Sequence, residues 1–293
     1  MDPAYILTQF FNGLVQGGFY ALLALGLSII FGLLRVVNFA HGVMYMLGAF
    51  VAYYGAQYFW LPYIAALIVA PVVVGLFGIV LERVLLRRLY KLDPLYNLLL
   101  TFALVLIIED AMRSVAGSLG SPYSIPAFLG GVTNLGFSLY PTYRIFVIIV
   151  CLIVCAVTYI VIERTPIGAQ LRAATENPVL TRALGINVDL LITLAFGVGV
   201  GIAAFAGVLN APNTNVVPDM GDSIIITTFA IVVIGGMGSI IGSIVSGFVI
   251  GIVTAFGAVV FPPISTTLPF ILMAIVLLFR PAGLFGRAEG GAH

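Results

Sequence analysis

The sequence predicts an all-α polytopic membrane protein with about nine transmembrane helices, within a range of eight to ten. Of its 293 residues, 62% are hydrophobic and 8% are charged, whereas an ordinary soluble domain carries about 25% charged residues. A bilayer core about 30 Å thick needs roughly 20 apolar residues per spanning helix. Four long stretches lack Asp, Glu, Lys and Arg: 32 residues after Asp2, 46 after Arg35, 29 after Asp189 and 57 after Asp222.

This composition excludes a soluble globular protein, a disordered protein and a nucleic-acid binder. The exclusion rests on the apolar composition, since the net charge of +1 says little about partners. The longest charged segment, 163–189, is too short to form a domain with its own core. We therefore expect one transmembrane domain over residues 1–293, which contains that segment as a cytoplasmic element.

The basic residues predict the orientation of the chain. They collect in 82–93, in 163–189 and in the tail at Arg280 and Arg287, and Lys and Arg mark the cytoplasmic side of a membrane. The N-terminus carries only Asp2, so we expect it outside and the C-terminus inside.

The spans follow from this orientation. The first span ends at Arg35, and 36–81 holds two spans with an outer turn near Trp60. Single crossings follow in 94–117, 142–162 and 190–212. Residues 223–279 must end inside, and their length favours three crossings over one.

A stripe of polar residues runs along the first span. Gln9, Asn12 and Gln16 recur at helical spacing, so they share one face together with Tyr20. Polar side chains within a span face the bundle interior or a cavity. The stripe therefore predicts either residues that line a translocation path or hydrogen bonds between helices.

Asn38, His41 and Gly42 lie just beyond Arg35 and are expected within the membrane. His41 can act as a gate near the cytoplasmic third of the bilayer, or it can be a structural histidine bonded to a neighbouring backbone. We assign the three residues provisionally to the translocation path.

Small residues recur every four positions near the C-terminus, at Gly235, Ser239, Ser243, Gly247 and Gly251. On a helix they form one ridge that lets another helix approach closely in lipid. Gly235, Gly236 and Gly238 also predict a broken or re-entrant segment, and such breaks often border a transport path. A tight helix crossing without a substrate role explains the same glycines.

Glu109, Asp110 and Arg113 form a charged group near the expected outer end of 94–117. Glu109 and Arg113 are four residues apart with the acid first, which favours an ion pair on a helix. A proton relay is the alternative interpretation.

The sequence lacks the motifs for ATP hydrolysis and for metal binding. The one lysine, Lys91, follows Tyr90, so the Gly-Lys-Ser/Thr of a phosphate-binding loop is absent. Two histidines cannot form a multi-histidine metal centre. We expect no enzyme activity, no metal and no cofactor in this chain.

The segment 163–189 predicts two short helices. Pro166 can open the first helix, Pro178 favours a break at or before Asn177, and Gly185 can end a second helix over about 178–184. Two capped helices on an inner loop suit docking to a cytosolic protein, whereas a solvated connector is the alternative. The expected docking residues are Arg172, Ala173, Ala174, Glu176, Asn177, Arg182, Gly185, Ile186 and Asn187.

The sequence resembles the permease subunits of branched-chain amino acid ABC transporters, specifically the high-affinity permease of the pair. The resemblance covers nearly the whole chain. It rests on residues 26–32, 37–42, 172–174, 183–187, 206–209, 235–239 and 279–286.

The resemblance implies a fold like that of type II importers, in a bacterial or archaeal inner membrane. It implies a second homologous permease, two cytosolic ATPases that bind ATP and Mg, and an external solute-binding protein. The segment around 172–187 matches the coupling helices of the family.

Leucine, isoleucine and valine are the expected substrates. Similar permeases serve urea, short amides or aromatic acids, and these remain alternatives. An ion-coupled secondary carrier is a rival class. It would need a pair of carboxylates near the middle of the bilayer, and this sequence lacks such a pair.

Overall fold

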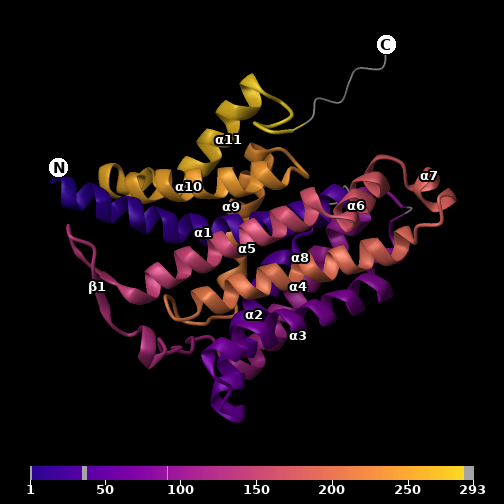
Figure 1. Cartoon of the computed structure of the whole chain (residues 1–293). Coiled ribbons are helices and arrows are strands. Elements are labelled where there is room, and N and C mark those ends of the chain that lie inside the picture. Colours follow the sequence, from indigo (N-terminus) through magenta and orange to yellow (C-terminus); the bar gives the residue numbers. More distant parts are fainter. Residues whose placement is uncertain (1, 35–37, 91, 287–293) are drawn as a thin grey trace. The chain divides into compact units, whose positions relative to one another are not determined.

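The computed structural model describes residues 2–34, 38–90 and 92–286. Arg35, Lys91 and Arg287, which contribute to the predicted orientation, lie outside the described residues. The elements are α1 (Pro3–Leu34), α2 (Ala40–Phe59), α3 (Tyr63–Val84), η1 (Leu86–Arg88), α4 (Pro94–Ala116), η2 (Ala127–Leu129), β1 (Val132–Asn134), β2 (Leu139–Pro141), α5 (Thr142–Arg164), α6 (Pro166–Glu176), α7 (Pro178–Ala183), α8 (Val188–Asn210), α9 (Met220–Gly235), α10 (Ile240–Val260), η3 (Pro262–Ile264) and α11 (Leu268–Phe279) (Figure 1).

The predicted class, an all-α membrane protein, is confirmed. In the described part of the chain six helices are long and apolar enough to cross a membrane: α1, α3 with η1, α4, α5, α8 and α10. Helix α2 has 20 residues, and α9 and α11 are shorter apolar helices. The count of nine crossings stays a prediction because, of the helices α9, α10 and α11, only α10 is among these six.

The described residues form two compact units, and the division passes through α1, α5 and α9. Unit 1 holds 1–25, 124–156 and 227–293, and unit 2 holds 26–123 and 157–226. The prediction of one domain over 1–293 stays a prediction.

The core of unit 2 is the packing of α8 against α2 and α3, which lie together in Figure 1. Glycines bring the backbones into contact: a Cβ atom on Gly75 would lie 3.0 Å from the carbonyl oxygen of Gly197, and one on Gly48 would overlap the backbone of Ala204. Because lipid supplies little driving force between helices, close backbone packing of this kind holds them together. Between α2 and α3, Trp60 ends α2 at φ 50°, so the expected turn there is confirmed.

Unit 1 is built on the crossing of α1 and α10, which lie side by side in Figure 1. A Cβ atom on Gly247 would lie 2.5 Å from the Cα of Ala21, and one on Gly251 would overlap the backbone of Gly17. Both helices therefore contribute small residues at four-residue spacing to one contact. A short antiparallel hairpin, β1–β2, precedes α5, with Thr133 opposite Tyr140.

Ser239 and Gly235 do not belong to this ridge, contrary to the sequence-based assignment. Helix α9 ends at Gly235 and α10 begins at Ile240, so the four-residue pattern continues across a break. The Ser239 hydroxyl caps α10 by accepting a hydrogen bond from the Gly242 N–H at 3.1 Å, as short polar side chains do at helix starts. The ridge on α10 starts at Ser243.

Candidate functional site

The coupling segment, residues 163–189, has the two short helices that the sequence predicts. Thr165 and Pro166 begin α6, and Asn177 caps α7 by accepting a hydrogen bond from the Leu180 N–H at 2.9 Å. Helix α7 ends at Ala183, and Gly185 follows at φ 83°, a conformation that glycine adopts without strain. The predicted helix boundaries are therefore confirmed to within one residue.

The two arginines expected to dock a partner are bound within the chain. Arg172 lies 3.3 Å from Glu163 and also donates to the carbonyl of Ile162 at the end of α5. Arg182 lies 2.8 Å from Asp189 at the start of α8. These contacts tie the segment to α5 and α8, so both arginines already have partners within the chain.

The remaining predicted residues of the segment have mixed surroundings. Ala174 is buried and Ala173 is half-buried, whereas Glu176 is exposed. The Ile186 N–H donates to the Thr181 carbonyl at 3.3 Å and so closes the end of α7. Asn187 caps α8 by accepting from the Leu190 N–H at 3.0 Å.

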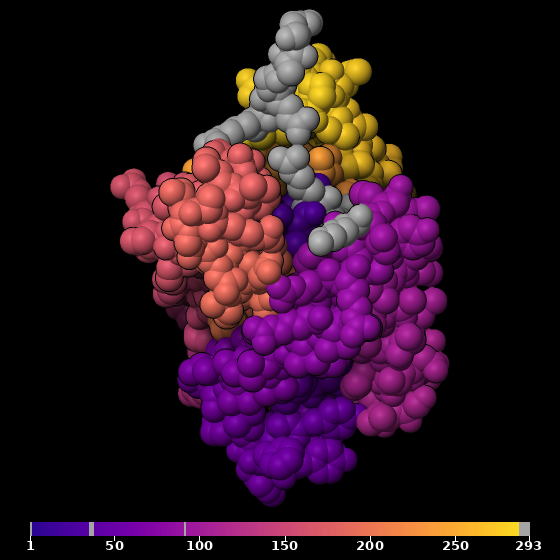
Figure 2. Space-filling model, turned by 90° about the vertical axis from the view of Figure 1, so that its right-hand side faces the viewer, coloured from indigo at the N-terminus to yellow at the C-terminus, as the bar shows by residue number. Residues whose placement is uncertain are grey.

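The most exposed apolar side chains of the segment were missed by the sequence analysis. They are Ile167, Val179, Leu180 and Leu184, of which Val179 and Leu184 are each 73% exposed. The segment forms the salmon-coloured surface in Figure 2. Apolar side chains held outward by capped helices are typical of a protein interface. The sequence pattern that could have indicated them is the presence of apolar residues on short helices with polar caps.

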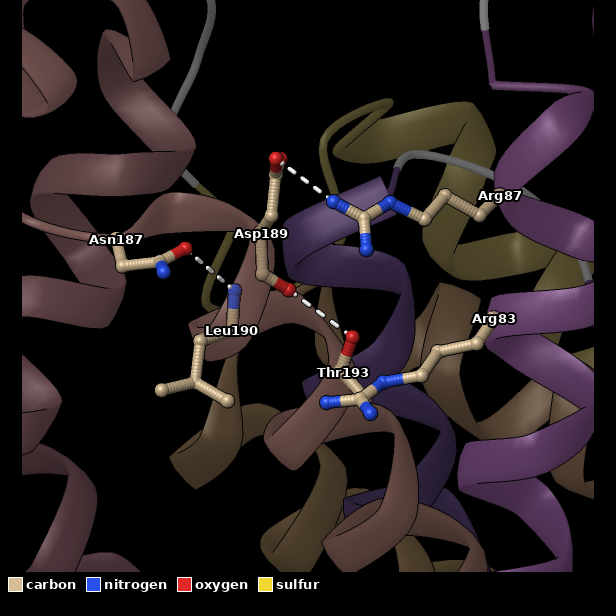
Figure 3. A pocket seen from close by; sticks show the side chains of 6 residues that line it. All are labelled: Arg83, Arg87, Asn187, Asp189, Leu190 and Thr193. Carbon is tan, nitrogen blue, oxygen red and sulfur yellow. Dashed lines mark hydrogen bonds and ion pairs between the residues drawn. The ribbon is translucent and has the colours of Figure 1, made fainter.

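A cavity of about 190 Å³ lies where α3 and η1 meet the start of α8. It is lined by Arg83, Arg87, Asn187, Asp189, Leu190 and Thr193 (Figure 3). Arg87 lies 2.7 Å from Asp189, whose other oxygen meets Arg182. The basic segment 82–93 and the coupling segment thus lie at the same end of unit 2.

Beneath this cavity a buried carboxylate, Glu82, is satisfied by two hydroxyl donors. Thr193 donates to it at 2.8 Å and Tyr90 at 3.0 Å. Burial, together with the Glu82 carboxylate, raises the pKa of Tyr90, so the phenol keeps the proton that it donates. Because a buried charge without partners is costly, Thr193 holds this end of α3 against α8, and Tyr90 holds the chain after η1 beside the same carboxylate.

Asn38 and His41 are buried in unit 2, at 2% and 0% exposure. Both side-chain polar atoms of Asn38 lack a hydrogen-bond partner within the described part of the chain. His41 lies against the crossing of α1 and α8 at Gly26. An orphaned buried amide is rare, and it distinguishes Asn38 from the other predicted residues of the path.

The predicted path glycines lie at tight contacts. A Cβ atom on Gly42 would lie 2.6 Å from the Gly221 carbonyl oxygen. Gly235 contacts Gly242 of the next helix, and Gly236, at φ 101°, contacts Gly286. These contacts favour helix packing as the reason for the glycines, while Gly238, at φ 83°, turns the chain between α9 and α10.

Two motifs far apart in the sequence meet at the Gly236 break. The N–H groups of Leu284 and Phe285 donate to the carbonyls of Ile234 and Gly235, at 2.8 and 3.0 Å. The segment after α11 thereby satisfies carbonyl groups left without partners at the end of α9.

The polar stripe of α1 is hydrogen-bonded within unit 1. Asn12 accepts from Tyr140 and from Arg144, each at 2.9 Å. Gln9 accepts from Asn12 at 3.3 Å, and Gln16 donates to Tyr20 at 2.9 Å. Of these bonds, only the one from Arg144 joins α1 to another helix, α5, whereas Gln9 and Gln16 bond within α1 itself. Helical spacing could not have indicated the long-range partner Arg144.

The ion pair predicted between Glu109 and Arg113 is wrong. The ion pairs formed by the described residues do not include it. Glu109 is 6% exposed and lies beside Asp222 at the start of α9. Helical spacing favoured the local partner, but α9 brings a second acid to the same place. Asp110, in contrast, is exposed.

The fold defines a multi-pass helical membrane protein with a structured loop between two of its spans. The family model described as the branched-chain amino acid transport system / permease component matches residues 9–277. No group of three or more His, Cys, Asp or Glu in the described ranges could hold a metal ion.

Curated relatives match from end to end. The chain is 32% identical to the high-affinity branched-chain amino acid transport system permease protein BraD of Pseudomonas aeruginosa, over 97% of each chain. It is 31% identical to LivH of Escherichia coli K12, again over 97% of each. LivM of the same organism is 27% identical over 90% of this chain and 67% of its own. The chain therefore belongs to the branched-chain amino acid transport permease family and is a transporter subunit.

Proposed function

We propose that this chain forms half of the translocation path of an ATP-driven importer for leucine, isoleucine and valine. The observation that carries the proposal is the match to BraD and LivH over 97% of each chain. The apolar membrane helices fit a small solute without net charge. Urea, short amides and aromatic acids are the alternative substrates within the same architecture.

The proposed complex has a second homologous permease, two cytosolic ATPases and an external solute-binding protein. The similarity to LivM, over 90% of this chain, supports a related second permease. The exposed apolar side chains of the coupling segment support an ATPase as its partner, and ATP and Mg belong to that subunit.

We place the chain in a bacterial or archaeal inner membrane, with the N-terminus outside and the C-terminus inside. The basic segments that meet through Arg87, Asp189 and Arg182 support one cytoplasmic end for unit 2.

Within the membrane, Asn38 is the strongest proposed residue of the path, because its buried amide has no partner among the described residues. An amide can donate to a carboxylate and accept from an ammonium group, as a bound amino acid would require. His41 and Gly42, which come three and four residues later in the chain, are proposed with it. The contacts of Gln9, Asn12 and Gln16 favour a structural role for the α1 stripe.

Co-purification from the native membrane tests the class. A tagged chain in mild detergent should bring down a second permease and two ATPases, identified by mass spectrometry. A homo-oligomer without an ATPase would overturn the proposal and favour an ion-coupled carrier, beginning with the Glu109–Asp222 contact.

Competition tests the substrate. Uptake of radiolabelled leucine by cells that express the complete importer should be inhibited by isoleucine and valine, and not by urea or phenylacetate. Inhibition by urea alone would assign the importer to the alternative substrates.

A further inference from the structure

The cavity between α3 and α8 contains a cation that the described residues do not neutralise. Arg83 points into the cavity (Figure 3) and makes no ion pair with any described residue. Asp189, the one acid in the lining, is already bound by Arg87 and by Arg182. Among the described residues, the Arg83 guanidinium is therefore the one in the lining without an acid at ion-pair distance.

A second donor accompanies Arg83. The Asn187 side-chain oxygen accepts from the Leu190 N–H, which leaves its NH₂ group free to donate. The Thr193 hydroxyl has two acceptors, Glu82 at 2.8 Å and the Asp189 carbonyl at 3.0 Å, so its one proton is already used (Figure 3). A guanidinium and an amide at one mouth suit an anion with several oxygens, such as a phosphate.

An apolar stripe leads from the cavity along each helix. On α3, Val80 and Leu76 precede Arg83 by three and seven residues and are 55% and 58% exposed. On α8, Leu194 and Val198 follow Leu190 by four and eight residues and are 48% and 55% exposed. Helical spacing places each stripe on the same helix face as the cavity residue that begins it.

Both stripes lie on the same side of the α3–α8 contact. Gly75 meets Gly197 and Pro71 meets Gly201, so residue numbers run in opposite directions and the helices are antiparallel. At about 100° of rotation per residue, the two stripes are displaced from that contact toward the same side. They form one apolar surface that ends at the guanidinium of Arg83.

We propose that this surface binds an anionic phospholipid, with its phosphate at Arg83 and Asn187 and its acyl chains along α3 and α8. Basic pockets between transmembrane helices at the cytoplasmic side bind acidic head groups. The inference rests on the proposed function, which puts this end of unit 2 in the cytoplasmic leaflet. The bound phosphate would neutralise Arg83 and hold the end of α3 beside the coupling segment.

Lipid retention tests the proposal on the full chain, purified with the partners that it carries. The protein is titrated with phosphatidylglycerol or with phosphatidylcholine of the same acyl chains, and bound lipid is counted by native mass spectrometry. The variants are Arg83→Gln and, as a matched control, Arg88→Gln, which removes an exposed arginine that does not line the cavity.

Phosphatidylglycerol should bind in preference to phosphatidylcholine, and Arg83→Gln should weaken its binding about fivefold, as expected for one arginine at an anionic surface. Arg88→Gln should leave binding unchanged, and Arg83→Lys should keep most of it. If Arg83→Gln does not fold, Leu194→Gln in the apolar stripe serves as the second variant and should weaken the binding of both lipids.

Three results would overturn the proposal. The first is equal binding of the two lipids, and the second is an equal effect of Arg83→Gln and Arg88→Gln. The third is binding of glycerol phosphate as strong as that of phosphatidylglycerol. That result would indicate a site for a free phosphate. Loss of the partner subunits from the wild-type sample would count against the proposed function and leave the lipid titration readable.

Discussion

In the coupling segment, polar side chains hold the helix ends by hydrogen bonds. Along the α1–α10 crossing, the two backbones come into contact because glycines have no side chain. Asn177 supplies an oxygen to the first turn of α7. Gly247 and Gly251 supply nothing but space for Ala21 and Gly17. We expect the coupling segment to tolerate changes of side-chain volume and to be sensitive to lost hydrogen bonds. We expect the α1–α10 crossing to be sensitive to side-chain volume and to tolerate lost hydrogen bonds.

This difference follows from the solvent that each region is expected to meet. In water, exposed helix ends need partners for their N–H groups, and short helices gain little from propensity alone. In lipid, apolar burial does not drive helices together, so close van der Waals contact has to. A single large side chain is therefore more damaging at the crossing than in the loop.

The largest effect is expected from Gly247→Leu. Its Cβ atom would lie 2.5 Å from the Cα of Ala21, and a backbone atom cannot move aside as a side chain can. Overpacking of this kind costs about 1–3 kcal/mol or more. We expect most of the folded chain to be lost, measured as the monodisperse fraction on size-exclusion chromatography.

Val249→Leu is the control for that variant, because Val249 lies on the same helix and is 49% exposed. It should assemble like the wild type. A Gly247→Leu chain that assembles fully and transports would refute the role of the ridge.

Next in size is the double variant Val179→Asp with Leu184→Asp. Both side chains are 73% exposed, so the folded chain should accept the change, while a charged group would disrupt an apolar docking contact. ATP-driven uptake should fall at least about tenfold, which corresponds to about 1.4 kcal/mol. The control is Leu119→Asp, at a residue 96% exposed beyond the far end of α4.

Charge reversal by Arg172→Glu with Arg182→Glu sharpens the same test. It places acids beside Glu163 and Asp189, so the segment should lose its orientation while the chain still inserts. Normal ATPase-coupled uptake in this variant would show that the orientation of the segment does not matter.

A smaller effect is expected from Thr193→Val, which removes one donor from the buried Glu82 carboxylate. An unsatisfied buried group costs about 1–3 kcal/mol. The melting temperature in detergent should fall, and Thr193→Ser should retain most of the stability because it keeps the hydroxyl. Equal melting temperatures for the valine and serine variants would mean that the hydrogen bond contributes nothing.

The smallest effect is expected from Asn177→Ala, which removes the cap of α7. Loss of such a cap costs about 1 kcal/mol. Hydrogen exchange of the α7 amides should speed up, whereas Asn177→Asp, which keeps a capping oxygen, should protect them. Unchanged exchange in the alanine variant would rule out the cap as the element that holds α7.

Local patterns in the sequence predicted local structure well. Pro166, Pro178 and Gly185 defined α6 and α7 because capping and proline geometry act over four residues. The glycines at 235–238 defined the break before α10. The charge-free stretches predicted a membrane protein because a bilayer excludes unpaired charge.

Tertiary structure alone decided which groups meet. Asn12 binds Arg144, Glu109 lies beside Asp222 without an ion pair to Arg113, and Arg182 shares Asp189 with Arg87. In each of these pairs the two residues come from different elements of the chain, so the spacing along one helix cannot reveal them. The sequence by itself determined the membrane class, the family and the two short helices α6 and α7, since these depend on composition and short-range geometry. The cavity at Arg83 required the antiparallel contact of α3 and α8, because its two walls are about 100 residues apart in the chain.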